Sequence, residues 1–159
     1  RGITMGVGGG FDPGGKLTRG QFITLLLRAY GIEPDENPVD NFADAGDIYY
    51  TGYLAAAKRL SIADGVGDNR FAPESDITRQ EMFKLLYTAL KIFGKVPEGS
   101  SGRTLADFSD SGEIANWAKE SMTALVEAGS ISGSGGRLHP TGTTTRAEMA
   151  QVLYNLINN

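Results

Sequence analysis

Apolar positions recur with helical spacing in three stretches of the chain. In each stretch the hydrophobic residues follow the i, i+3, i+4, i+7 rule, which places them on one face of an α-helix. The three stripes are Phe22, Leu25, Leu26 and Ala29, then Met82, Leu85, Leu86 and Ala89, and then Met149, Val152, Leu153 and Leu156. We therefore expect three amphipathic helices of one type, each burying its apolar face against a neighbouring element.

Start and stop signals bound these three helices. Each is preceded by Thr, with Gln or Glu three positions later, which is the spacing of a capping box. The pairs are Thr18 with Gln21, Thr78 with Glu81, and Thr145 with Glu148. In addition, Gly31 and Gly94 stand where a glycine ends a helix.

A second type of helix is expected ahead of two glycine-rich turns. It covers roughly Ile48–Leu60 and Ile114–Ala128. A Phe-x-Asp triplet leads into each copy, and linkers rich in Pro, Gly and polar residues, 33–41 and 95–104, separate the units. The unit is therefore a helix, a glycine turn, a short extended piece and a capped helix.

This unit is repeated along the chain. The stretches that begin at Phe11, Phe71 and Leu138 align, with Pro two positions later and Thr-Arg seven positions later. We expect three repeats, at 1–33, 34–96 and 97–159. The first lacks most of its first helix, because Arg1-Gly-Ile-Thr matches only that helix's end. We expect upstream sequence, a cleaved chain or an exchanged segment to supply the missing helix.

Composition and charge exclude several classes of function. The 159 residues are 40% hydrophobic and 21% charged, which suits a packed core. The net charge of −4 argues against a nucleic-acid partner. There is no cysteine and one histidine, His139, so thiolate chemistry is excluded and a multi-His metal site is not expected. We expect no cofactor, no metal and no membrane insertion, since no run approaches about 20 apolar residues.

The repeat resembles the S-layer homology (SLH) domain. The resemblance lies in the order Phe-x-Asp, aromatic helix, glycine turn, Phe-x-Pro and Ile-Thr-Arg-x-Glu, and it covers nearly the whole chain. Residues 77–81 and 144–148 are close to the family's Ile-Thr-Arg-Ala-Glu signature, whereas 17–21 depart from it at the last two positions. The resemblance implies an all-α, pseudo-three-fold spindle, with the capped helices in a central bundle and grooves between repeats.

The resemblance also implies a function. SLH domains anchor bacterial surface proteins non-covalently to secondary cell-wall polymers, and many recognise a terminal pyruvylated N-acetylmannosamine. We therefore expect a secreted protein of the bacterial cell surface that binds an anionic cell-wall polysaccharide and is not an enzyme. The alternative is a helical-repeat module that binds a protein partner. A small glycan hydrolase is a third reading, disfavoured because near-identical repeats give like environments and acid–base catalysis needs unlike ones.

Three arginines are the main candidates for ligand contact. Arg19, Arg79 and Arg146 each occupy the first position of a capped helix. The helix dipole disfavours a cation there by about 0.3–1 kcal/mol, so a compensating anion is expected. Helix-start amides, turn amides and the guanidinium together could hold a sugar carboxylate. The alternative is that each Arg pairs with a local carboxylate such as Asp76, Asp44 or Asp110.

The repeat motifs contain further candidates for ligand contact. Aromatic rings stack on sugars but also pack in cores, and the glycines serve positive-φ turns or close approach of a ligand. The two aspartates of the Phe-x-Asp triplets either cap a helix or accept sugar hydroxyls. The candidate ligand-binding residues, besides the arginines, are Trp117, Tyr49, Asp44, Asp110, Gly65, Gly67, Gly133, Gly135 and Lys58.

Overall fold

The computed structural model describes residues 15–131 and 133–157, and it divides into two compact units. Unit 1 contains residues 15–77 and 145–150, and unit 2 contains residues 78–131, 133–144 and 151–157. The predicted first-repeat elements before residue 15 lie outside the described residues. The division into three repeats at 33/34 and 96/97, and the three-fold arrangement, remain predictions.

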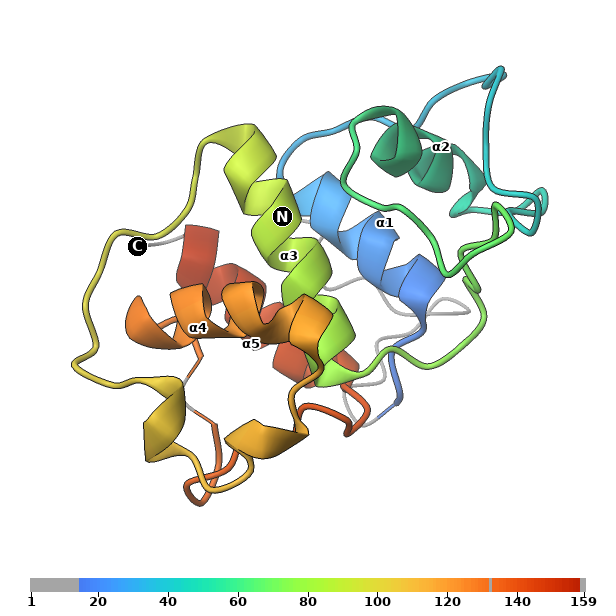
Figure 1. Ribbon diagram of the computed structural model, residues 1–159. Helices are drawn as coiled ribbons and strands as arrows, with labels where there is room; N and C mark the ends of the chain where they lie inside the picture. The colour runs from blue at the N-terminus through green and yellow to red at the C-terminus, as the bar shows by residue number, and fades with distance from the viewer. Residues whose placement is uncertain (1–14, 132, 158–159) are drawn as a thin grey trace. The chain divides into compact units, whose positions relative to one another are not determined.

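The described residues form helices and no extended strand, which confirms the predicted all-α class (Figure 1). Five isolated β-bridges are their only extended pairings. The elements are α1 (Arg19–Ala29), α2 (Thr51–Arg59), α3 (Arg79–Phe93), η1 (Leu105–Asp107), η2 (Ser111–Glu113), η3 (Asn116–Ala118), α4 (Lys119–Glu127) and α5 (Arg146–Ile157). None of these helices is long and apolar enough to cross a membrane.

The capped helices begin where the sequence predicts. In α1 and α3 the Thr side chain accepts from the third helical amide while the Gln or Glu side chain accepts from the Thr amide. The start of α5 has the same pair of bonds, between Thr145 and Glu148. Gly94 then ends α3 in the left-handed conformation, at φ 69°.

In unit 1 the core lies between α1 and α2 (Figure 1). Phe22 and Leu26 of α1 and Leu54 of α2 are fully buried, as is Leu17 just before α1. Each such side chain contributes about 1.5–3 kcal/mol on burial. The linker is held on α2 from outside, because Arg59 makes two hydrogen bonds to the Asp35 carboxylate, at 3.0 and 2.8 Å.

In unit 2 the core lies between α3 and α4. Met82, Leu86, Met122 and Leu125 are buried at this contact. Outside it, Lys91 lies 3.6 Å from the Glu120 carboxylate.

The helices of the second type are shorter than predicted. In the first copy, Ile48 and Tyr49 lie in a turn before α2, since Thr51 Oγ1 accepts from the Ile48 amide and donates to the Ala45 carbonyl. In the second copy, Ile114 is extended and η3 precedes α4. The Ala115 amide is withdrawn from the helix because it donates to the side chain of Gln80. The apolar pattern shows the buried face but not these side-chain bonds.

Candidate functional site

The amides at the capped helix starts are engaged by backbone carbonyls. In unit 1 the amides of Arg19 and Gly20 donate to the Ser75 and Pro73 carbonyls, both at 2.9 Å. In unit 2 the amides of Arg79 and Gln80 likewise donate to the Gly142 and Pro140 carbonyls, both at 2.9 Å. The Arg146 amide donates to the Gly15 carbonyl. The expected anion cradle of free helix-start amides is therefore wrong at these positions, because a loop of another repeat uses them.

Arg19 is held inside unit 1. Its side chain is 6% exposed, and Nε donates to the Phe71 carbonyl at 2.8 Å. The guanidinium also lies 4.5 Å from the centre of the Phe71 ring, a cation–π contact. These contacts offset the unfavourable helix dipole from within the protein.

Arg79 lies at a more open position in unit 2, where it is half-buried. Its guanidinium rests against Gly142, since a Cβ on that glycine would come within 2.6 Å of Nη1. Next to it, Gln80 joins α3 to the segment before Trp117 by accepting from the Ala115 amide at 2.8 Å. The start of α3, which carries Arg79, is therefore tied through Gln80 to the segment before Trp117.

The charge of Arg146 acts on an exposed tyrosine of unit 1. Arg146 is 8% exposed, and its positive charge has a minor effect on the pKa of Tyr49, in the lowering direction. Burial is the larger effect and leaves the pKa of Tyr49 raised, with the Glu74 charge adding to the rise and a hydrogen bond from the Gln21 side chain opposing it. Gln21, Glu74 and Arg146 therefore all act on the Tyr49 hydroxyl, and we call these four residues the unit 1 cluster.

The two candidate aromatics occupy equivalent positions. Tyr49 comes directly before the N-cap of α2, and Trp117 comes directly before the N-cap of α4. They are 54% and 53% exposed, so both keep an accessible ring face. The alternative that these two residues pack in the core is therefore wrong.

Asp44 and Asp110 cap a loop, not a helix. Asp44 accepts from the amides of Phe71 and Ala72 at 2.8 and 2.9 Å, and Asp110 accepts from those of Leu138 and His139 at 2.8 Å. Burial raises the pKa of each carboxyl, but the backbone hydrogen bonds outweigh it and leave both values lowered. Neither side chain caps α2, η2 or α4.

The first glycines of the two turns have a structural role. Gly65 and Gly133 have φ of 88° and 70°, and a Cβ would lie 2.4 and 2.5 Å from the carbonyl oxygens of Arg70 and Arg137. The turn therefore closes only with glycine at this place. Gly67 and Gly135 also have positive φ, but the space beside them is open.

Lys58 holds the linker to the glycine turn of unit 1. Its ammonium donates to Asp40 and to the Asn69 side chain, each at 2.8 Å, and lies 5.4 Å from the Phe42 ring centre. These contacts account for Lys58 within the fold, and its part in ligand binding remains a prediction.

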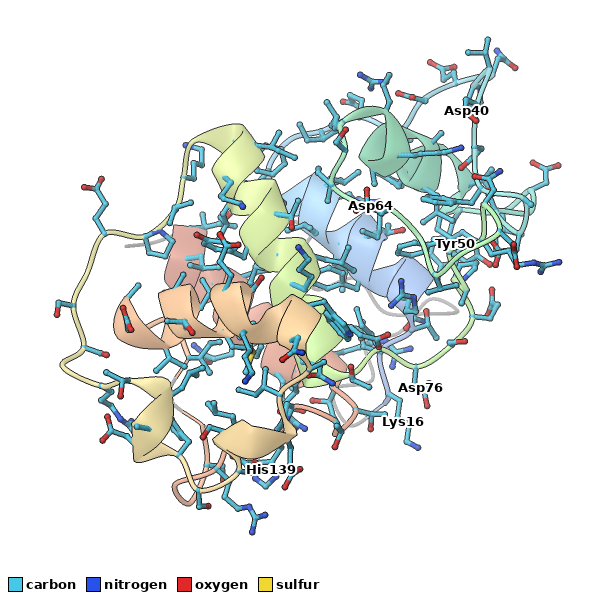
Figure 2. The ribbon with its side chains drawn as sticks, in the orientation of Figure 1. Lys16, Asp40, Tyr50, Asp64, Asp76 and His139 are labelled. Atoms are coloured by element: carbon cyan, nitrogen blue, oxygen red, sulfur yellow. The ribbon has the colours of Figure 1, made fainter. Side chains whose placement is uncertain are left out.

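Three neighbours of the candidate residues are not among the candidates named from the sequence. The Tyr50 hydroxyl donates a hydrogen bond to the Glu74 carboxylate (Figure 2 labels Tyr50). Glu74 lies between Pro73 and Ser75, whose carbonyls hold the start of α1. Thr141 takes the corresponding place in unit 2, between Pro140 and Gly142. The signal was present in the repeat alignment, where the residue after Pro is Glu in one copy and Thr in another. No cluster of metal-ligating side chains occurs among the described residues.

Comparison with known proteins gives consistent matches along the chain. The S-layer homology domain profile matches residues 1–23, 41–83 and 107–150. The chain is 35% identical over 145 residues to the S-layer protein sap of Bacillus anthracis, covering 91% of this chain and 17% of that protein. It is 34% identical over 146 residues to an S-layer protein of Bacillus thuringiensis subsp. finitimus, with the same coverage.

An enzyme is also among the relatives. An amylopullulanase of Thermoanaerobacterium thermosulfurigenes is 31% identical over 150 residues, which is 92% of this chain and 8% of the enzyme. The chain thus spans less than a fifth of the length of these relatives. S-layer proteins with this domain are associated with the cell wall at the bacterial surface. The profile, the relatives and the repeated geometry show that this chain belongs to the S-layer homology domain family.

Proposed function

We propose that the chain is a non-catalytic anchoring module that binds a secondary cell-wall polysaccharide through an anionic terminal sugar of the pyruvylated N-acetylmannosamine type. The observation that carries the proposal is a half-exposed aromatic ring at the same place in each unit, directly before the N-cap of α2 or α4. In unit 1 the ring is Tyr49, on which the charge of Arg146 acts. In unit 2 the ring is Trp117, and the segment before it is hydrogen-bonded to Gln80, the neighbour of Arg79; we call this ring and the start of α3 the unit 2 cluster.

The chemistry of these clusters suits a carboxylated sugar. An exposed ring face packs on the apolar side of a sugar ring. A guanidinium donates two parallel hydrogen bonds to a carboxylate, and a charged bond of this kind contributes about 1.5–3 kcal/mol. A ketal-linked carboxylate on the sugar presents both features to one cluster.

The two aspartates are unsuited to acid catalysis. A general acid needs a carboxyl whose pKa is raised toward neutrality. Asp44 and Asp110 have lowered pKa values and are committed to backbone amides. The enzyme relative shares only a small part of its length with this chain, so we assign its activity to its remaining sequence.

A pelleting assay tests the anchoring function. Purified bacterial cell walls are mixed with the protein before and after chemical extraction of the secondary polymer. We expect the protein to pellet with intact walls and to stay in solution with extracted walls. Pelleting that is unchanged by extraction would instead indicate a protein or peptidoglycan partner.

Removal of Arg79 tests the site itself. We expect Arg79→Ala to weaken binding to the purified polymer about tenfold or more, because one charged contact is lost. Arg28→Ala is the matched control, since Arg28 is an exposed arginine in the last turn of α1. Isothermal titration calorimetry measures both affinities, and thermal melts confirm that both variants are folded. Equal affinity of the two variants would show that Arg79 is structural.

A further inference from the structure

The loop after the proline differs in charge between the two units. In unit 1, the carbonyls of Pro73 and Ser75 hold the loop on the start of α1, and Glu74 lies between them. In unit 2, the carbonyls of Pro140 and Gly142 hold the loop on the start of α3, and Thr141 lies between them. The same pair of backbone hydrogen bonds therefore flanks a carboxylate, Glu74, in unit 1 and a neutral hydroxyl, Thr141, in unit 2.

Glu74 is fixed beside the exposed aromatic ring of its unit. Its carboxylate accepts a hydrogen bond from the hydroxyl of Tyr50, a residue that is 4% exposed. Tyr50 is itself held on both sides. A Cβ on Gly20 would come within 2.7 Å of its ring, and Tyr49 packs edge-on against it with ring centres 5.1 Å apart. The pKa values of Tyr49 and Tyr50 are both raised. Burial is the largest cause for each, and the negative charge of Glu74 raises both further.

This carboxylate opposes the positive charge of its cluster. Arg146 and Glu74 act on the Tyr49 hydroxyl with opposite sign. An incoming carboxylate at Tyr49 would be attracted by the first and repelled by the second. In unit 2 the loop residue beside Gly142, against which Arg79 rests, is the uncharged Thr141.

We propose that Glu74 is a specificity-determining residue that weakens the binding of carboxylated sugars at the unit 1 cluster, so that the unit 2 cluster is the stronger site for them. This inference rests on the proposed function and names the site at which that function is chiefly performed. Tyr49 in unit 1 then favours a neutral sugar residue, which stacks on the ring without carrying a negative charge to Glu74.

The test uses two probes, one with a negative charge and one neutral. One is the methyl glycoside of N-acetylmannosamine bearing a 4,6-linked pyruvate ketal, and the other is its methyl ester. NMR titration follows the Trp117 indole signal for unit 2, which is unambiguous because the chain has one Trp. The Gly20 amide signal serves for unit 1. In the wild type we expect the acid probe to shift the Trp117 signal at the lower concentration.

Exchanging the loop charges reverses this preference. Glu74→Gln keeps an acceptor for Tyr50 and removes the charge, so the acid probe should bind unit 1 about two- to fivefold more tightly, as for two exposed charges near contact distance. Glu74→Thr copies the unit 2 loop and is the second variant for the same effect. Thr141→Glu should weaken the acid probe at Trp117 by a similar factor. The ester should bind all forms equally.

The outcomes separate the two proposals. If the acid probe binds but the charge variants do not change its affinity, or change that of the ester equally, the inference about Glu74 is wrong and the proposed function stands. If neither probe moves either signal while the protein still pellets with intact walls, recognition of this sugar and the inference about Glu74 both fail.

Discussion

At the scale of single residues, a buried hydroxyl without a partner marks a weak point in unit 2. Thr144 is 0% exposed, and its Oγ1 has no hydrogen-bond partner among the described residues. The repeat alignment places it where the other copies have Leu17 and Ile77, which are also fully buried. A polar atom has therefore been placed in an apolar position, at a cost of about 1–3 kcal/mol.

Replacing this hydroxyl should stabilise the protein. Thr144→Val keeps the shape and removes the unsatisfied atom, so we expect the free energy of unfolding to rise by about 1–2 kcal/mol and Tm by about 2–6 °C. Thr143→Val is the control, because Thr143 is exposed and should give little change. Calorimetry measures both. A lower Tm for Thr144→Val would mean that the hydroxyl is satisfied by a bound water.

The arginines also differ from one another at this scale. Arg19 is bonded to a carbonyl and stacked on Phe71, whereas Arg79 rests against Gly142 at a half-buried place. These two copies of one motif thus have different environments, which the motif alone does not show.

At the scale of elements, the contact between the two helix types depends on matched sizes. The second residue of α1 is Gly20, and the Tyr50 ring lies directly over it. The second residue of α3 is Gln80, and the residue corresponding to Tyr50 at the N-cap of α4 is the small Ala118. In unit 1 a glycine thus contacts a large ring, whereas the corresponding positions of unit 2 hold a long side chain and a small residue.

This pairing predicts a large effect for a small substitution. Alanine is the better helix former by about 1 kcal/mol, yet Gly20→Ala should destabilise the protein by about 1–3 kcal/mol. The reason is that the added Cβ would lie 2.7 Å from the Tyr50 ring and 3.1 Å from Pro73. Gly112→Ala is the control, since nothing lies within 4 Å of a Cβ there. Urea unfolding compares the two, and equal midpoints would refute the size argument.

At the scale of the whole molecule, each unit uses the same carboxylate device to hold its long loop. Asp44 ties residues 71 and 72 in unit 1, and Asp110 ties residues 138 and 139 in unit 2. The pKa of both carboxyls is lower in the folded state than the value of 3.8 for the unfolded chain. Their contribution to stability is therefore complete above pH 3.8 and is lost as the pH falls through the pKa of the folded state.

Acid should therefore weaken both units. We expect the urea midpoint to be nearly constant from about pH 7 to pH 5 and to fall below about pH 4. Asp110→Asn should lower the midpoint at neutral pH, because an amide offers one acceptor oxygen to two backbone amides, and the deficit should shrink in acid. Asp64→Asn, at an exposed position labelled in Figure 2, is the control. A deficit that stays constant at all pH values would contradict the assignment.

The sequence predicted well those features that are local along the chain. Helical spacing and the Thr-x-x-Gln/Glu pairs located α1, α3 and α5, because a capping box is formed by residues three positions apart. The Phe-x-Asp and Thr-Arg motifs identified the family, and the family profile confirmed it. The starts of α2 and α4 were predicted too early, since distant or side-chain hydrogen bonds hold the preceding residues out of the helix.

By itself, then, the sequence determined the helix class, the capped starts and the family, because these depend on periodicity and on contacts within one turn. Only the tertiary structure decided which charges meet. A loop of another repeat accepts hydrogen bonds from the helix-start amides, and the carbonyl and ring of Phe71 hold Arg19. Glu74 accepts a hydrogen bond from Tyr50, which packs against Tyr49, whereas the counterpart of Glu74 in unit 2 is Thr141. These contacts join residues far apart in the chain, and their energies depend on burial and distance, which no local pattern specifies.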